Sequence, residues 1–363
     1  MKIALLGAAG FVGRTAAAEL ARRPEVVELI LVDYMIRDAK KMAKGLSPKC
    51  RYAMADVGKP AELTRLLEGV NVVANAVGPC REYEEAILTT CASMKINAAS
   101  VGDSAMPPEY YRKIHDAFRQ AKAVAVSGCG IMPGWTELLA AHFLGTPKSA
   151  PDNAAANPSQ LLFFSPNRFG GYAFLREFAR RIESEIAAPH EAPDGRYYRL
   201  SVDTVFGVPE KAGGWISGIA STVGKLGVIG KEFSAAMMLW MRSAMTATPG
   251  TPAAICCAFD GKSIARLEDT SGNLAGILLA EAAVRLGSRS LQEKGLIPLH
   301  ELISRDSARA IASEAGAVIK TGLAAQEPLT PLLFTEEDPH KRLLPGLLLR
   351  QLAPQTASKH SQD

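Results

Sequence analysis

Three glycines near the start of the chain could bring the backbone close to a phosphate group. Gly7, Gly10 and Gly13 lie three residues apart, after an apolar run at 2–6 and before a stretch with helical spacing at 11–23. Free amides and the dipole at a helix N-terminus favour a pyrophosphate, and the strand–glycine–helix context strengthens an otherwise weak motif. The alternative is a tight turn that only joins a strand to a helix. We predict a dinucleotide site here.

An acidic residue follows at the distance such a site requires. Asp33 comes directly after the apolar run at 28–32 and twenty residues after Gly13, where a carboxylate can accept hydrogen bonds from the adenosine ribose. A carboxylate repels a 2′-phosphate, which favours NAD, although nearby basic residues could still serve NADP. Asp33 could also simply cap the strand end. The cofactor contacts predicted from these segments are Gly7, Ala9, Gly10, Phe11, Val12, Asp33 and Tyr34, with Arg37, Lys40 and Lys41 as the nearby cations.

A second loop with a glycine, ANAVGPC at 74–80, follows another apolar run. Ligands in doubly wound folds bind at the carboxyl ends of the strands. We therefore predict that Ala76, Val77, Gly78 and Pro79 lie beside the nicotinamide or its ribose. A plain Gly-Pro turn is the alternative.

A third segment, SGCGIMPGWTELLAAHFL at 127–144, bends at two glycines and a Pro-Gly pair before a helix opens. The amide end of that helix suits a substrate carboxylate. In the later loop at 163–172 an arginine could bind a carboxylate in bidentate fashion, or could simply be solvated. The predicted substrate contacts are Gly130, Pro133, Gly134, Trp135, Thr136 and Arg168.

Few side chains near these loops could move a proton. The predicted catalytic residues are Asp103, Cys129 and Tyr83. Asp103 could instead cap the helix after it, Cys129 could be a small packed residue, and Tyr83 could only pack. Glu137 and His142 are two further candidates for proton transfer. Glu137 could instead only complement the dipole of its helix, and His142 could have a purely structural role.

Strands and helices alternate over the first part of the chain, and the strands are apolar throughout. This pattern predicts a parallel sheet covered on both faces, a doubly wound (Rossmann) α/β fold. The predicted strands are 2–6, 28–32, 50–54, 70–76, 96–99 and 122–127, and the helices are 11–23, 36–44, 60–69, 82–94 and 107–121.

The regular alternation of predicted strands and helices ends before a segment rich in Pro, Asn, Ala and Ser at 146–159. Strand-like pieces at 160–164, 196–206 and 253–259 mix with helices at 172–186, 231–246 and 273–286, which predicts an α+β domain. We predict a dinucleotide-binding domain at 1–128 and a substrate and dimerisation domain at 129–330. Residues 331–363 would form a C-terminal helix and tail, with packing against the first domain as one option.

Composition excludes several other classes of protein. The 41 Lys and Arg residues balance 37 Asp and Glu residues and are well mixed, unlike a nucleic-acid footprint. The cysteines and histidines have no metal-ligand spacing, and no apolar run reaches the ~18 residues of a membrane span. Neither a G-x-S-x-G elbow nor a P-loop is present. We expect a cytoplasmic protein with reduced cysteines, without a transmembrane segment or nucleic-acid partner, that forms a homodimer. The apolar stretch at 213–245 suits the core or a dimer contact, and the alternatives are a lining for an apolar substrate or a contact with a membrane surface.

Four motifs resemble the saccharopine dehydrogenase family: GAAGFVGR, ANAVGP, the VGD of 101–103 and GCGIMPGWTELLA. The stretch from Phe259 to Leu302 resembles the end of that family's second domain. The resemblance covers about residues 1–145 and 253–302. It implies a Rossmann domain, a second domain that carries the substrate, and NAD(P)-linked hydride transfer at a carbon–nitrogen bond.

The chain departs from the family pattern at three positions. Ser100 stands where the family commonly has the aspartate of Y-V-D, Ala98 replaces its tyrosine, and Met132 occupies a position that is acidic in several reductases. We predict an NAD(P)-dependent oxidoreductase that acts on an amino-acid-like, carboxylate-bearing small molecule. The departures leave two alternatives: a reductase of a C=O or C=C bond in a less polar substrate, and a dinucleotide-binding sensor or partner subunit without turnover.

Overall fold

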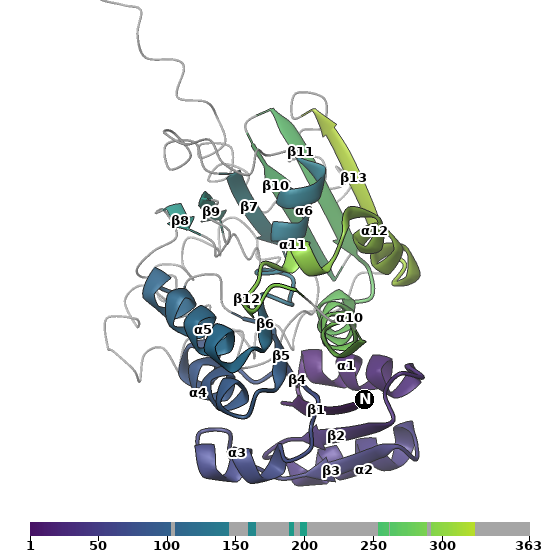
Figure 1. Cartoon of the computed structure of the whole chain (residues 1–363). Coiled ribbons are helices and arrows are strands. Elements are labelled where there is room, and N and C mark those ends of the chain that lie inside the picture. Colours follow the sequence, from purple (N-terminus) through teal and green to yellow (C-terminus); the bar gives the residue numbers. More distant parts are fainter. Residues whose placement is uncertain are drawn as a thin grey trace, which may run out of the picture.

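Two sheets, with helices packed on and between them, make up the described part of the chain (Figure 1). The computed structural model describes residues 1–102, 106–144, 253–260, 262–288 and 292–323, and the backbone of the strands at 159–164, 189–191 and 197–201.

The first sheet has seven strands in the order β12-β6-β5-β4-β1-β2-β3, and all of its pairs are parallel. Its strands are β1 (Lys2–Leu6), β2 (Glu28–Val32), β3 (Cys50–Ala53), β4 (Val72–Asn75), β5 (Asn97–Ser100), β6 (Val124–Ser127) and β12 (Gly295–Leu296). The order reverses between β1 and β4, where ligands of doubly wound sheets bind. The predicted Rossmann fold is confirmed.

Apolar side chains on both faces of the strands explain why helices cover both faces. Ile3 and Leu5 belong to one buried cluster, whereas Ala4 and Leu6 belong to the other, because alternate residues of a strand point to opposite sides. The first cluster packs under α1 (Phe11–Arg22), α2 (Ile36–Leu46) and α10 (Leu274–Ser288), and the second under α3 (Pro60–Leu66), α4 (Cys80–Ser93) and α5 (Pro108–Ala121).

The second sheet has six strands in the order β13-β11-β10-β7-β9-β8, and all its pairs except β7 with β9 are antiparallel. Its strands are β7 (Ser159–Phe164), β8 (Pro189–Glu191), β9 (Tyr197–Ser201), β10 (Ala254–Phe259), β11 (Ser263–Asp269) and β13 (Val318–Leu323). Three helices accompany it, α6 (Trp135–Phe143), α11 (Leu299–Leu302) and α12 (Arg305–Glu314). The predicted second α+β domain is confirmed. The helices predicted at 172–186 and 231–246 and the tail at 331–363 lie outside the described residues.

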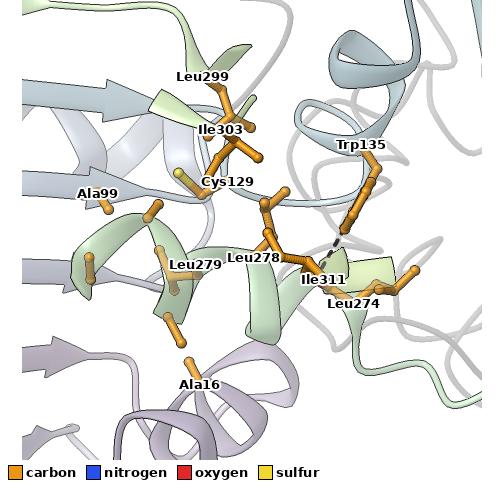
Figure 2. Packing of buried hydrophobic residues seen from close by; sticks show 14 of the residues in the cluster. Ala16, Ala99, Cys129, Trp135, Leu274, Leu278, Leu279, Leu299, Ile303 and Ile311 are labelled. Atoms are coloured by element: carbon orange, nitrogen blue, oxygen red, sulfur yellow. Dashed lines mark hydrogen bonds between the residues drawn. The ribbon is translucent and has the colours of Figure 1, made fainter. Parts of the chain in front are cut away.

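Helix α10 lies between the two sheets (Figure 1). It packs against α1 so closely that a Cβ on Gly276 would stand 2.5 Å from the Thr15 Cβ atom. On the other side the Trp135 indole donates a hydrogen bond of 3.3 Å to the Leu274 carbonyl (Figure 2). The strand β12 then pairs with β6, so a late part of the chain completes the sheet that the first 128 residues begin.

Candidate functional site

The turn between β1 and α1 has no room for side chains at its first and third glycines. A Cβ on Gly7, whose φ is +73°, would lie 2.8 Å from the Ala76 carbonyl, and one on Gly13 would lie 2.0 Å from the Gly7 oxygen. The helix begins after Gly10, with no side-chain cap and no acidic residue in its first turn. The first amides of a helix have no partner within the helix, so this turn is built to receive an anion.

Asp33 joins this turn to the loop after β2. The residue is only 7% exposed. Its Oδ2 accepts the Ala9 amide at 2.8 Å and its Oδ1 accepts the Met35 amide at 2.9 Å. Both carboxylate oxygens therefore already have a backbone donor, which adds a role in loop structure to the predicted contact with ribose.

The predicted contact Tyr34, at the same edge, is 79% exposed, and Phe11 is also exposed. Arg14, directly after the third glycine, donates from Nε to the Ala9 carbonyl at 2.7 Å and reaches Asp38 at 3.5 Å. Its side chain is 57% exposed. Our set of cations omitted Arg14, although its place in GAAGFVGR was the available signal; Arg37, Lys40 and Lys41 are exposed.

The loop after β4 lies beside the glycine turn at the switch point of the sheet. The Ala76 amide donates to the Leu6 carbonyl at 2.9 Å, and the Val77 amide donates to the Asn75 side chain at 3.0 Å. A cis peptide bond joins Gly78 to Pro79. The geometry suits the predicted nicotinamide contacts, which stay a prediction.

Three neighbouring strands end in uncharged polar residues. Asn75, Ser100 and Ser127 are the last residues of β4, β5 and β6, and they pair in register. The Asn75 amide donates to the Ser100 hydroxyl at 3.0 Å, and the Ser127 hydroxyl donates to Glu84 Oε1 at 2.9 Å. We call these four side chains the strand-end network.

Glu84 was not predicted as part of the site. It is fully buried, and burial raises the pKa of its carboxyl group although the Ser100, Tyr110 and Ser127 hydroxyls favour the charged form. In the sequence, the signal was an acid on the apolar stripe of a helix, four residues after Cys80 and three before Ile87. Residues at this spacing share one helix face.

The turn after β6, like the turn after β1, requires glycine at particular positions of its backbone. Gly128 and Gly134 have positive φ, and a Cβ on Gly134 would stand 2.1 Å from the Gly130 oxygen. A cis peptide bond precedes Pro133. The Gly134 amide donates to Glu137 Oε2 at 2.5 Å, which explains Glu137 as a helix cap.

Side chains predicted near this turn are directed into the protein. Cys129 is fully buried, and burial raises the pKa of its thiol, which opposes a role as a thiolate. Trp135 and Thr136 are also fully buried; Trp135 bonds to Leu274, and the Thr136 hydroxyl donates to Glu137 at 2.6 Å. The catalytic role predicted for Cys129 and the substrate contacts predicted for Trp135 and Thr136 stay predictions, and the burial of these side chains gives them no support.

The other predicted catalytic residues give no direct support for proton transfer. Tyr83 is half-buried and packs in the cluster under α3 and α4. Asp103 and the predicted substrate contact Arg168 lie outside the described residues. His142 shares a 2.8 Å hydrogen bond with the Ile303 carbonyl, which supports its structural alternative.

The described part of the chain has neither a candidate metal site nor a candidate membrane span. It contains no group of His, Cys, Asp and Glu residues that could hold a metal ion. Within the same ranges, no helix is both long enough and apolar enough to cross a membrane.

Comparison with known proteins agrees with this geometry. Residues 3–126 match the family model of the saccharopine dehydrogenase NADP binding domain. The apo saccharopine dehydrogenase (L-Glu forming) of Saccharomyces cerevisiae matches with 12% identity and a TM-score of 0.53 over 89% of this chain and 99% of that chain. At this identity the match shows a shared fold.

Other solved structures match over 35% of this chain. Pen from Bacillus thuringiensis has 11% identity, a TM-score of 0.30 and 50% of its chain covered. Serine dehydrogenase from Escherichia coli has 10% identity, a TM-score of 0.27 and 81% of its chain covered. No curated protein sequence matches the chain significantly.

Proposed function

We propose that this chain is a saccharopine dehydrogenase-type oxidoreductase that transfers a hydride at a carbon–nitrogen bond of an amino-acid-like substrate. The match of residues 3–126 to the NADP binding domain supports the proposal, and so does the shared fold. The observation that carries the proposal is the turn at Gly7, Gly10 and Gly13, where side chains added at Gly7 and Gly13 would collide with backbone beside a helix start without a side-chain cap. Such a turn lets a pyrophosphate come close to the amides of α1.

The dinucleotide would extend along the carboxyl edge of the first sheet. Its pyrophosphate would bind the first turn of α1, and its adenosine would pass Asp33 and the exposed ring of Tyr34. Its nicotinamide would then lie toward the strand-end network, across the switch point between β1 and β4. The nicotinamide supplies the hydride, and this chain supplies the binding and orientation.

We propose NADP(H) as the preferred form. The preference for NAD expected from Asp33 has no support in the family model, which describes NADP binding. It also assumed that the carboxylate faces the ribose freely, whereas both oxygens accept backbone amides. Arg14 lies beside this loop with an exposed guanidinium group that could meet a 2′-phosphate.

A second candidate function is reduction of a C=O or C=C bond in a less polar substrate. The observation that favours it is the uncharged set of strand ends, Asn75, Ser100 and Ser127. A carboxylate on the substrate would then depend on the backbone amides of the turn at 128–134.

Titration with NADPH and NADH, followed by nicotinamide fluorescence, tests the proposal. We expect micromolar binding with a preference for NADPH, and an Arg14→Gln variant should lose about tenfold in NADPH affinity, the effect of one charge-assisted hydrogen bond. Its NADH affinity should stay the same. The control is Arg22→Gln, which removes an exposed arginine from the other end of α1.

Absence of binding to either dinucleotide in the wild type would contradict the proposal. Binding should be followed by a screen of amino acids with NADP and of imines, ketones and enones with NADPH. Turnover of an amine or imine would support the first function, and turnover of a ketone or enone the second. Tight binding without any turnover would favour a sensor.

A further inference from the structure

Glu84 is a buried acid that hydride transfer does not itself require. It lies in α4 on the face that also carries Cys80, Ile87 and Cys91, and its side chain is fully buried. No ion pair among the described residues involves Glu84, and its Oε2 atom has no hydrogen-bond partner there. A buried charge without a cation is very costly, so the carboxyl group is expected to stay protonated.

The carboxyl group ties together the ends of three strands. Glu84 Oε1 accepts the Ser127 hydroxyl at 2.9 Å. Ser100 is among the hydroxyls that act on the carboxyl group, and its oxygen accepts the Asn75 amide at 3.0 Å. One side chain from α4 is thereby linked to β4, β5 and β6.

The loops that leave these strands are bonded to the backbone of the same strand-end residues. The Val101 amide donates to the Asn75 carbonyl at 3.0 Å, and the Cys129 amide donates to the Ser100 carbonyl at 2.8 Å. A Cβ on Gly102 would stand 2.4 Å from the Ser127 hydroxyl and 2.5 Å from the Gly128 amide nitrogen. The two loops are in such close contact that a shift of Ser127 must move both of them.

The surroundings of Glu84 contain titratable groups, but among the described residues no cation forms an ion pair with it. Tyr110 and Tyr111 act on it from α5, and Cys129 from the turn after β6. Burial raises the pKa of all three groups, so they stay neutral over the range in which a carboxyl group titrates. Cys80 acts on Tyr110, and both Glu137 and the cation Arg81 act on Tyr111, so these three groups belong to the outer part of this environment.

We propose that Glu84 is a positioning residue whose neutral carboxyl group holds the ends of β5 and β6, and so fixes the loops at 101–102 and 128–130 for the nicotinamide. This inference rests on the proposed function, because that function puts the nicotinamide beside these loops. Glu84 acts through Ser100 and Ser127 and is not assigned a contact with the substrate.

The test compares two probes by calorimetry: NADPH, and adenosine 2′,5′-bisphosphate, which is the adenosine half of NADPH. Glu84→Gln keeps a neutral hydrogen-bonding group and should leave both affinities within about twofold of wild type. Glu84→Leu removes the hydrogen bonds at similar volume and should weaken NADPH about tenfold, the value of one hydrogen bond to a buried group. The affinity for adenosine 2′,5′-bisphosphate should not change.

The neighbouring Glu85 provides a matched control. It is on the same helix, its side chain is 47% exposed, and it pairs with Lys113. Glu85→Gln should leave both affinities at the wild-type value.

Two results would overturn the inference. One is an unchanged affinity for both probes in Glu84→Leu; the other is an equal loss of affinity for both probes, which would mean general damage to the fold. Wild-type protein that binds neither probe would overturn the proposed function, and this inference with it. Binding of NADPH with no effect at Glu84 would overturn only the inference.

If Glu84→Leu does not fold, the pH dependence of the two affinities decides. In the wild type the advantage of NADPH over adenosine 2′,5′-bisphosphate should fall as pH rises and the buried carboxyl group ionises. In Glu84→Gln it should change with pH only as far as the 5′-phosphate of adenosine 2′,5′-bisphosphate titrates, so the wild type should show the larger fall. Parallel pH curves for the two proteins would overturn the inference.

Discussion

At the two ends of the carboxyl edge of the first sheet, a buried carboxyl group finds its hydrogen-bond partners in different ways. At the β1–β2 end, Asp33 accepts two backbone amides. At the β4–β6 end, Glu84 accepts one serine hydroxyl at Oε1 and has no partner at Oε2 among the described residues. Amide donors replace the lost water for Asp33, whereas Glu84 depends on keeping its proton. The first end works through the backbone and the second through buried side chains.

Gly13→Ala should produce the largest effect on NADPH binding and stability, because it disrupts the glycine turn at the β1–β2 end of the sheet edge. The added Cβ would stand 2.0 Å from the Gly7 oxygen, and overpacking of this kind costs up to about 3 kcal/mol. We expect loss of measurable NADPH binding and a clear fall in the urea midpoint. Gly45→Ala is the control, since a Cβ there has no neighbour within 4 Å, and it should be neutral or slightly stabilising. Equal NADPH affinity in the two variants would show that the turn is not a phosphate site.

Asp33→Asn should have the next largest effect. A carboxamide has only one acceptor oxygen, so either the Ala9 or the Met35 amide would lose its partner, at a cost of about 1–3 kcal/mol. Urea unfolding measures this loss. Asp116→Asn, at an exposed position in α5, should change stability by less than about 0.5 kcal/mol. If both variants unfold at the same urea concentration, Asp33 does not hold the two loops.

The smallest of the three effects should be the change in stability with pH that Glu84 causes. The folded-state pKa of this carboxyl group is raised from its ordinary value of 4.5, so its neutral form stabilises the protein below that value. That stability is lost as pH rises toward the folded-state pKa, by at most about 1.4 kcal/mol per pH unit for one proton. Unfolding of wild type and Glu84→Gln across this range should show that the variant becomes relatively more stable with rising pH. A constant difference would contradict a buried neutral acid.

The first sheet was predictable because its signals are local. Strands such as 28–32 are apolar along their whole length, and the helices between them have one apolar stripe, which together predict a two-sided parallel sheet. The strands β11 and β13 were not individually predicted. They pair in antiparallel fashion across more than forty residues of sequence, with Glu268 opposite Val318, and no local pattern encodes such a pairing.

The sequence by itself determined the glycine turn and the acid after β2. Their signals are three glycines at fixed spacing between a strand and a helix and a carboxyl group at a strand end, and both can be read within thirty residues. The tertiary structure alone decided that Arg14 reaches Asp38, that α10 returns to pack on α1, and that Glu84 lies beneath three strand ends. Burial depends on segments that are distant in the sequence, such as Ser100 and Ser127 around Glu84. The charge state of a buried acid depends on the donors those segments bring, and they become neighbours only when the chain has folded.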